Sequence, residues 1–230
     1  GFASFCGTNF CANPHALNDA VMPQGKICSF PVYLLPQNRY TVGERSNRKG
    51  RSFFMMNLEA LKVLRERRSC RSYKNEQIAD AELEAVLEAG TYAPTGRGAQ
   101  SPVIVAVQDR ETIGRLRRMN AAIMGNPDAD PFYGAPTVLV VLADKSLPTH
   151  VYDGACVMCN LLNAAHAAGL DACWIHRARE EFDSDEGKAL LKQWGIEGDY
   201  EGVGHCILGY RSGELQSAAE RKADYVIRVK

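Results

Sequence analysis

Two uninterrupted apolar runs, at residues 103–107 and 138–142, constrain the fold of this 230-residue chain more than any other feature. They consist of valine, isoleucine, leucine and alanine, and short runs of this composition are typical of strands buried on both faces. The charged stretch from Asp109 to about Ala122 lies between them and predicts a helix. Strands and helices that follow one another in this way predict an α+β domain, with a central sheet flanked by helices.

From Met56 onward the rest of the chain continues this pattern. Leu83, Val86 and Leu87 repeat at helical spacing after Asp80, which we expect to cap a helix that Gly90 terminates. The segment 92–100 contains one proline and two glycines and predicts a loop. Further helices are expected from Asn57, from His150 to Ala168 and from Asp183 or Asp185 to Trp194, and further strands at 172–175, 205–209 and 225–229. Because no repeat or linker interrupts residues 56–230, we interpret them as one domain.

Residues 1–55 differ from the rest of the chain in composition. They hold six of the eight phenylalanines, with six basic and two acidic residues, whereas residues 56–230 hold 21 basic and 25 acidic residues. The segment has no sustained period and does not resemble a secretory signal. We interpret it as an irregular N-terminal extension that is foreign to the fold, either a mis-assigned start or upstream sequence. A native but mostly irregular extension is the alternative.

The overall composition excludes two classes of partner and indicates a compartment. Lys+Arg and Asp+Glu both number 27, so the chain lacks the basic excess of a dedicated nucleic-acid binder. No apolar run approaches the roughly 18 residues of a membrane-spanning helix. We therefore expect neither nucleic acid nor membrane as a partner. The eight cysteines follow no disulfide framework, which indicates a reducing compartment, the cytoplasm.

The expected helix at 150–168 is apolar on several faces and has to be covered on more than one side. A domain of this size with short strands does not wrap such a helix completely, so we expect a homodimer with helices packed across its interface. Cys156 and Cys159 form a C-x-x-C pair inside this helix. A redox pair would stand at a helix start, where a thiol pKa is lowered, so we interpret both as small buried apolar residues.

The densest candidate for a binding site is the run Arg67-Arg68-Ser69-Cys70-Arg71. Arg67 and Arg71 are four residues apart and share a face if the helix continues. Two guanidinium groups and a hydroxyl group within one turn suit an anion such as phosphate, because arginine donates to it in a two-pronged fashion. A solvated basic helix end is the alternative.

Two other segments could meet a flat ligand. In the loop, Thr95 and Gln100 can hydrogen-bond to the edge of a heterocycle, and Gly96 and Gly98 allow the backbone to approach it closely. At 173–178 a strand leads into a polar turn whose backbone N–H groups could face a planar cofactor. By themselves the first segment is an ordinary loop, and His176 is more typical of a surface histidine than of a functional one.

We predict no catalytic residue and no metal ligand. The sequence contains no Ser-His-Asp order, no HExxH motif and no spaced carboxylate pair. The chemistry would therefore have to come from a bound organic cofactor.

Taken in order, these motifs resemble the FMN-dependent nitroreductase family over residues 56–230. The resemblance rests on R-R-S-x-R at 67–71, A-P-T-G-x-G-x-Q at 93–100, D-G-A-C-x-M at 153–158, W-I-H-R-A at 174–178, G-H-C-I-L-G-Y at 204–210 and the pair Arg221-Lys222. Each of these alone is weak, whereas the five motifs in the expected order, followed by the basic pair, are specific. Gly98, Ser101 and His176 depart from residues that are frequent in the family, which leaves the substrate open.

The resemblance implies a nitroreductase-like fold with a mixed or antiparallel sheet, and a homodimer with FMN at each of two interface sites. The implied FMN contacts are Arg67, Arg68, Ser69 and Arg71, then Pro94, Thr95, Gly96, Gly98 and Gln100 from the other subunit, Trp174, Ile175, His176 and Arg177 behind the flavin, and Arg221 and Lys222 at the phosphate. It further implies a ping-pong reaction in which NADH or NADPH gives hydride to the flavin N5 and a small electron-poor acceptor, such as a nitroaromatic or a quinone, is then reduced. Reductive dehalogenation or another FMN redox reaction, and a non-catalytic flavin-binding module, are the alternatives.

Overall fold

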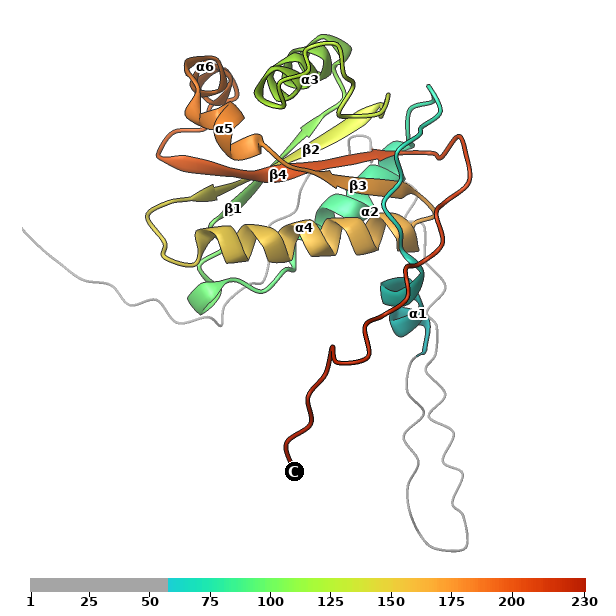
Figure 1. Ribbon diagram of the computed structural model, residues 1–230. Helices are drawn as coiled ribbons and strands as arrows, with labels where there is room; N and C mark the ends of the chain where they lie inside the picture. Colours follow the sequence, from blue (N-terminus) through green and yellow to red (C-terminus); the bar gives the residue numbers. More distant parts are fainter. Residues whose placement is uncertain (1–57) are drawn as a thin grey trace, which may run out of the picture. The chain divides into compact units, whose positions relative to one another are not determined.

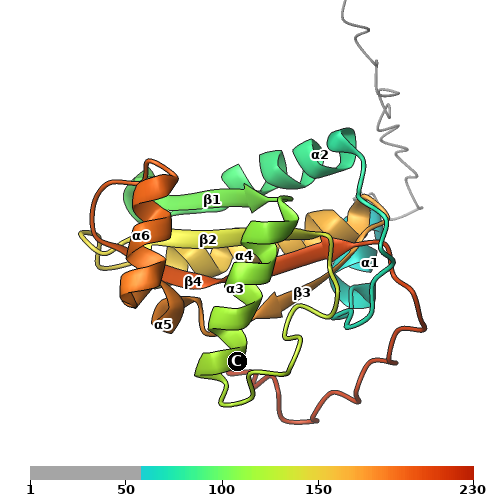
Figure 2. The ribbon, with the colours of Figure 1, turned by 90° about the horizontal axis from the view of Figure 1, so that it is seen from above.

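A four-stranded antiparallel sheet with the order β1-β2-β4-β3 forms the centre of the described part of the chain, residues 58–230 (Figures 1 and 2). In this computed structural model, Met56–Lys230 form one compact unit. The strands are β1 (Pro102–Val107), β2 (Thr137–Asp144), β3 (Asp171–Ile175) and β4 (Tyr200–Gly209). The expected α+β class is confirmed. The interpretation of residues 1–55 and the expected cap at Asn57 lie outside the described residues.

Helices cover both faces of the sheet (Figure 1). On one face lie α3 (Arg110–Ile123), α5 (Ala178–Asp183) and α6 (Asp185–Gln193), and on the other lie α2 (Asp80–Thr91) and α4 (His150–Ala167). A helix α1 (Leu58–Glu66) contacts α4, and a 3-10 turn η1 (Gly96–Gly98) lies in the loop before β1. Among residues 58–230, no helix combines the length and the apolar character that crossing a bilayer requires.

The position of β2 inside the sheet explains why its residues 138–143 are all apolar. Val138, Val140 and Leu142 pack into the cluster beneath α3, α5 and α6, whereas Leu139 and Val141 pack into the cluster beneath α2 and α4. All five side chains are fully buried. Because successive side chains of a strand point to opposite faces, a strand covered on both faces needs apolar residues throughout.

The ends of α2 differ from the prediction. Asp80 is the first helical residue rather than the cap, which is Ala79, and the Glu82 carboxylate accepts from the Ala79 N–H at 2.9 Å. Gly90 lies inside the helix and does not terminate it. A Cβ atom at Gly90 would come within 2.6 Å of Leu161 Cδ2, so the glycine allows α2 to pack closely against α4.

The region after β3 also differs from the prediction. Ser184, not Asp183 or Asp185, caps α6, and its hydroxyl oxygen accepts from the Gly187 N–H at 3.1 Å. The short helix α5 was not expected from the sequence, because its six residues are too few to show an apolar period.

Two further expectations are wrong. Residues 225–229 form no strand, and their apolar side chains are exposed, for example 85% for Ile227. An apolar run forms a strand only where a neighbouring strand accepts its backbone hydrogen bonds, and these residues pair with neither edge of the sheet. The helix expected at 150–168 is present as α4, but Cys159 is exposed on it and only Cys156 is partly buried.

We expect Gly202→Ala to destabilise the fold by about 1–3 kcal/mol, because overpacking a tight contact forces the backbone to shift. A Cβ atom there would lie 2.2 Å from the Ala178 carbonyl oxygen, which cannot rotate away. Gly114→Ala in α3 is the matched control, since its nearest neighbour would be Arg118 Nη1 at 3.5 Å. Gly114→Ala should raise the free energy of unfolding by about 0.5–1 kcal/mol, because alanine is more favourable than glycine in a helix. Urea unfolding of both variants measures the difference, and equal stabilities would contradict the contact.

Candidate functional site

The basic run lies beside the edge strand β3. After α1 ends at Glu66, Ser69 forms a parallel bridge with Ala172, and the Cys70 N–H donates to the Ala172 carbonyl at 3.0 Å. This pairing brings Arg71 to the end of β3. Arg68 instead folds back, and its Nη1 donates to the Arg65 carbonyl at 2.7 Å, which satisfies a carbonyl at the end of α1.

A cavity of about 270 Å³ lies at the end of β3 and joins two of the predicted segments. Arg71 from the basic run and the four residues 174–177 line the same cavity. The rings of Trp174 and His176 stack, with centroids 5.9 Å apart and planes 23° apart. The structure therefore brings together a guanidinium group, a pair of stacked rings and the turn that follows β3.

Two buried donors close to this strand have no acceptor. Arg67 Nη1 and Trp174 Nε1 are buried and make no hydrogen bond within the described residues. Burial raises the pKa of the Cys206 thiol well above its usual value, and the nearby charge of Arg67 opposes that shift, which places the guanidinium group close to β4. Buried donors without partners cost free energy, so both donors call for an acceptor from outside these residues.

The neighbouring thiol is not a nucleophile. Cys70 lies in the middle of the basic run but is buried, and its Sγ donates to the Ser72 carbonyl at 3.2 Å. Burial raises the pKa of Cys70 above its usual value, so the thiol stays protonated near neutral pH. The basic run therefore offers donors and positive charge rather than a reactive sulfur.

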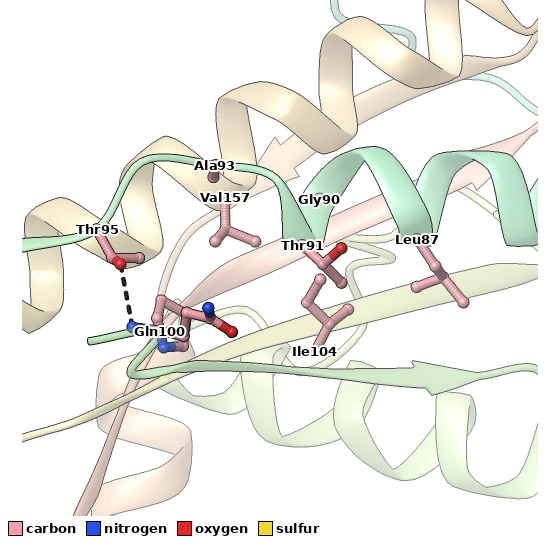
Figure 3. A pocket seen from close by; sticks show the side chains of 9 residues that line it. Leu87, Gly90, Thr91, Ala93, Thr95, Gln100, Ile104 and Val157 are labelled. Carbon is pink, nitrogen blue, oxygen red and sulfur yellow. Dashed lines mark hydrogen bonds between the residues drawn. The ribbon is translucent and has the colours of Figure 1, made fainter. Parts of the chain in front are cut away.

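The predicted loop forms a second site at the opposite edge of the sheet. Thr95 and Gln100 line a cavity of about 300 Å³ together with Leu87 of α2 and Ile104 of β1. Figure 3 shows Thr95 and Gln100 at one end of this cavity, joined by the bond from the Gln100 N–H to Thr95 Oγ1, 3.0 Å long. Since the sheet order is β1-β2-β4-β3, the two edge strands are three spacings apart, about 14 Å.

One buried carboxylate holds this loop in place. Asp153 of α4 is 4% exposed, and its Oδ1 accepts from the Gly96 N–H at 2.9 Å. Its Oδ2 accepts from the hydroxyl groups of Thr149, at 3.0 Å, and Ser101, at 3.3 Å. Gly96 is required here because a Cβ atom would come 2.4 Å from the Thr149 hydroxyl oxygen. The carboxylate therefore ties the middle of the loop, at Gly96, and Ser101, just after the loop, to α4.

The predicted phosphate contacts at the C-terminal end lie apart from both cavities. Arg221 donates through Nε and Nη2 to the Ala219 carbonyl, and Lys222 pairs with Asp224 at 3.8 Å. Pro94 and Gly98 are exposed on the loop. Within one chain the structure thus groups Arg71 with residues 174–177, and groups Thr95 with Gln100, but does not bring these two groups or the C-terminal pair together.

The comparisons with known proteins identify the family. The nitroreductase family model matches residues 64–210. This chain belongs to the nitroreductase family. A relative from Archaeoglobus fulgidus, provisionally named an NADH dehydrogenase or NAD(P)H nitroreductase, is 30% identical over 161 residues, which are 68% of this chain and 87% of that protein.

Two other similarities support this membership. A nitroreductase from Bacteroides fragilis, solved with bound FMN, superposes with a TM-score of 0.69 and 29% identity, over 75% of this chain and 99% of that one. The FMN reductase [NAD(P)H] of Bacillus subtilis is 34% identical over 86 residues, 37% of this chain and 32% of that protein. This nitroreductase-family chain therefore spans about a third of the length of the Bacillus protein.

All four non-glycine residues with positive φ in the described part of this nitroreductase-family chain line or flank the two cavities. Arg97 and Gln100 lie in the loop, and Tyr133 and Arg177 line the cavity at the end of β3. A left-handed conformation costs roughly 1–2 kcal/mol for a residue with a Cβ atom. Such residues concentrate at functional sites, so the strain supports both locations.

The site also contains residues that sequence reasoning missed. Asn120, Glu181 and His205 are fully buried and hydrogen-bonded to one another behind the turn at 176–177. Each is a polar residue at a core position of a helix or strand face that is otherwise apolar. This pattern was the sequence signal that could have indicated a buried polar network. It is visible only once the buried face of each element is known.

Proposed function

We propose that this nitroreductase-family protein is an NAD(P)H-dependent FMN oxidoreductase that acts as a homodimer in the cytoplasm. One observation carries the proposal. Two buried donors without acceptors, Arg67 Nη1 and Trp174 Nε1, adjoin the strand whose end forms a cavity with Arg71. FMN presents acceptors along its phosphate, its ribityl chain and its pyrimidine carbonyls, so the residues present fit this cofactor. The FMN-bound Bacteroides structure supports this assignment.

The residues divide the binding of FMN between them. Arg67, Ser69 and Arg71 would hold the phosphate, the ribityl chain and the pyrimidine edge, because a phosphomonoester carries about two negative charges at neutral pH. The turn at 174–177 would form the wall behind the flavin. When bound, FMN supplies the chemistry, accepting hydride from NADH or NADPH and passing reducing equivalents to an electron-poor acceptor such as a nitroaromatic or a quinone. The positive charge of the arginines favours negative charge on the pyrimidine edge.

A second copy of the chain would complete the site. Thr95 and Gln100 lie at the β1 edge and Arg71 at the β3 edge, with β2 and β4 and their covering helices between them. One cofactor cannot contact both groups of one chain without passing through the core. Large apolar side chains exposed near these elements, such as Tyr92 at 79% and Tyr152 at 73%, support an interface that covers them.

The C-terminal segment supports the same assembly. Val226 and Ile227 are 70% and 85% exposed, which is unusual for apolar residues that stand close together. An interface would cover them and bring Arg221 and Lys222 to a phosphate. Cys70, Cys156, Cys159, Cys173 and Cys206 are all free thiols, which supports a reducing compartment such as the cytoplasm.

The full chain, purified without added flavin and after addition of FMN, tests the proposal. We expect one FMN per chain, flavin absorption that bleaches with NADH or NADPH under nitrogen, and recovery of the absorption when a nitroaromatic or a quinone is added. Light scattering should give twice the mass of the 25.3 kDa chain.

Other results of this experiment would contradict the proposal in distinct ways. If the protein does not bind added FMN, the proposed function is wrong. Tight FMN binding without any response to NADH or NADPH would favour a non-catalytic flavin-binding module. If the flavin absorption recovers when halogenated phenols are added, but not when nitroaromatics or quinones are added, the result would favour reductive dehalogenation.

A further inference from the structure

A buried polar network lies directly behind the turn that ends β3. The Asn120 side chain comes from α3, the Glu181 side chain from α5 and the His205 side chain from β4, and all three are 0% exposed. Asn120 Nδ2 donates to the His176 carbonyl at 2.8 Å and also to Glu181 Oε1. Asn120 Oδ1 accepts from Arg177 Nε at 2.9 Å. One amide therefore contacts both residues of the turn.

The chemistry of the partners fixes the orientation of this amide. The His176 carbonyl and the Glu181 carboxylate only accept hydrogen bonds, so they must face the Asn120 NH₂ group, whereas the guanidinium group of Arg177 only donates and must face Oδ1. His205 Nε2 lies 3.0 Å from Glu181 Oε1 and donates to it. Phe132 and Phe182 pack against the His205 ring and exclude water from the far side. The partners thus fix the orientation of the Asn120 amide, while Glu181 Oε2 and His205 Nδ1 have no hydrogen-bond partner among the described residues.

The turn that this amide holds is strained. Arg177 has φ 77° and ψ 4°, in the left-handed region, where a side chain with a Cβ atom is disfavoured. It also begins α5, because its carbonyl accepts from the Glu181 N–H at 3.0 Å. A strained conformation of this kind persists only where surrounding contacts impose it. The bonds of Asn120 to the residues on either side of the 176–177 peptide supply that constraint.

We propose that Asn120, oriented by Glu181 and His205, is a positioning residue that holds the His176–Arg177 turn in its left-handed conformation and so sets the wall presented to the flavin. The inference rests on the proposed function, since His176 and Arg177 line the cavity assigned to FMN. Asn120 itself is buried behind that wall and acts through the turn. Glu181 orients the amide, because its Oε1 atom contacts both Asn120 Nδ2 and His205 Nε2.

The affinity for FMN and the midpoint potential of the bound flavin test this role in the full chain. We expect Asn120→Leu to raise the dissociation constant for FMN at least tenfold and to move the midpoint potential, because the turn loses both of its bonds. Leu116→Ala on the same helix is the matched control, since Leu116 is equally buried but contacts the apolar cluster. It should lower the urea midpoint of unfolding and leave FMN affinity within twofold of wild type.

A double-mutant cycle separates positioning from general stability. Glycine adopts the left-handed region freely, so in an Arg177→Gly background Asn120→Leu should raise the FMN dissociation constant less than threefold. The isosteric Asn120→Asp, which offers at most one donor in place of two, serves if Asn120→Leu does not fold. It should weaken FMN binding at least fivefold.

The outcomes distinguish this inference from the proposed function. If the wild-type chain takes up no FMN, the proposed function fails and this inference with it. If wild type binds FMN while the Asn120 variants keep its affinity and potential, the inference alone is overturned. Equal effects of Asn120→Leu in both backgrounds would also overturn it, because the strain at Arg177 would then be irrelevant.

Discussion

Asp153→Ala is expected to abolish retention of FMN, with a loss of affinity of at least 100-fold, although no atom of Asp153 is proposed to touch the cofactor. The substitution leaves the Gly96 N–H and the hydroxyl groups of Ser101 and Thr149 without their shared acceptor. Each buried donor left unsatisfied costs about 1–3 kcal/mol, so the loop would give up its present shape to reach water. Fluorescence titration of FMN and urea unfolding of the full chain measure the two effects.

Asp109→Ala is the matched control for this carboxylate. Asp109 caps α3 and accepts from the Thr112 hydroxyl group at 2.6 Å and from the Thr112 N–H at 2.7 Å, and these two bonds lower its pKa below the usual value. It lies away from both cavities. Its removal should cost about 1 kcal/mol of stability, as the loss of a helix cap does, with FMN affinity unchanged. If both variants bind FMN as tightly as wild type, the loop at 95–101 does not form part of the site.

Arg67→Glu is also expected to lower the affinity for FMN at least 100-fold. Arg67 is half-buried and its Nη1 atom has no partner among the described residues, so a negative charge there would repel the phosphate at short range and in a low dielectric. A second variant, Arg67→Met, keeps the packing of the aliphatic stem and removes only the charge, and it should weaken binding about tenfold. Titration of apoprotein with FMN at two salt concentrations measures both.

Arg118→Glu on α3 controls for the change of net charge. Arg118 is exposed on the other face of the sheet, and its charge is screened by water and salt. It should leave FMN affinity within twofold of wild type. Equal losses in Arg67→Glu and Arg118→Glu would mean that the basic run acts through net charge and not as a binding site.

Local sequence was sufficient to predict which segments form the framework. The runs at 103–107 and 138–142 both form strands, as predicted, but only the second is buried on both faces, whereas the first lies at the sheet edge with Ala106 exposed. Gly169 and Gly195 end their helices with φ of 80° and 72°. Residues 174–177 and Arg71 of the basic run were predicted as parts of one site, and they line one cavity. These features depend on hydrogen bonds and burial within a few residues, so the residue types themselves encode them.

Other features depend on partners that are remote in the sequence. Gly90 looked like a helix terminator, but Leu161, seventy-one residues later, makes it a packing residue. Residues 225–229 have the apolar composition of a strand, yet they pair with no strand of the sheet. The burial of Asn120, Glu181 and His205 arises because α3, α5 and β4 meet behind one turn.

By itself, then, the sequence determined most of the helices and strands and the chemical groups available to a flavin. Only the tertiary structure decided that the loop at 95–101 and the end of β3 lie on opposite edges of one sheet. The physical reason is that periodicity reports which face of an element is buried, whereas strand order follows from how all the apolar faces are covered at once. That order separates the two halves of the site within one chain.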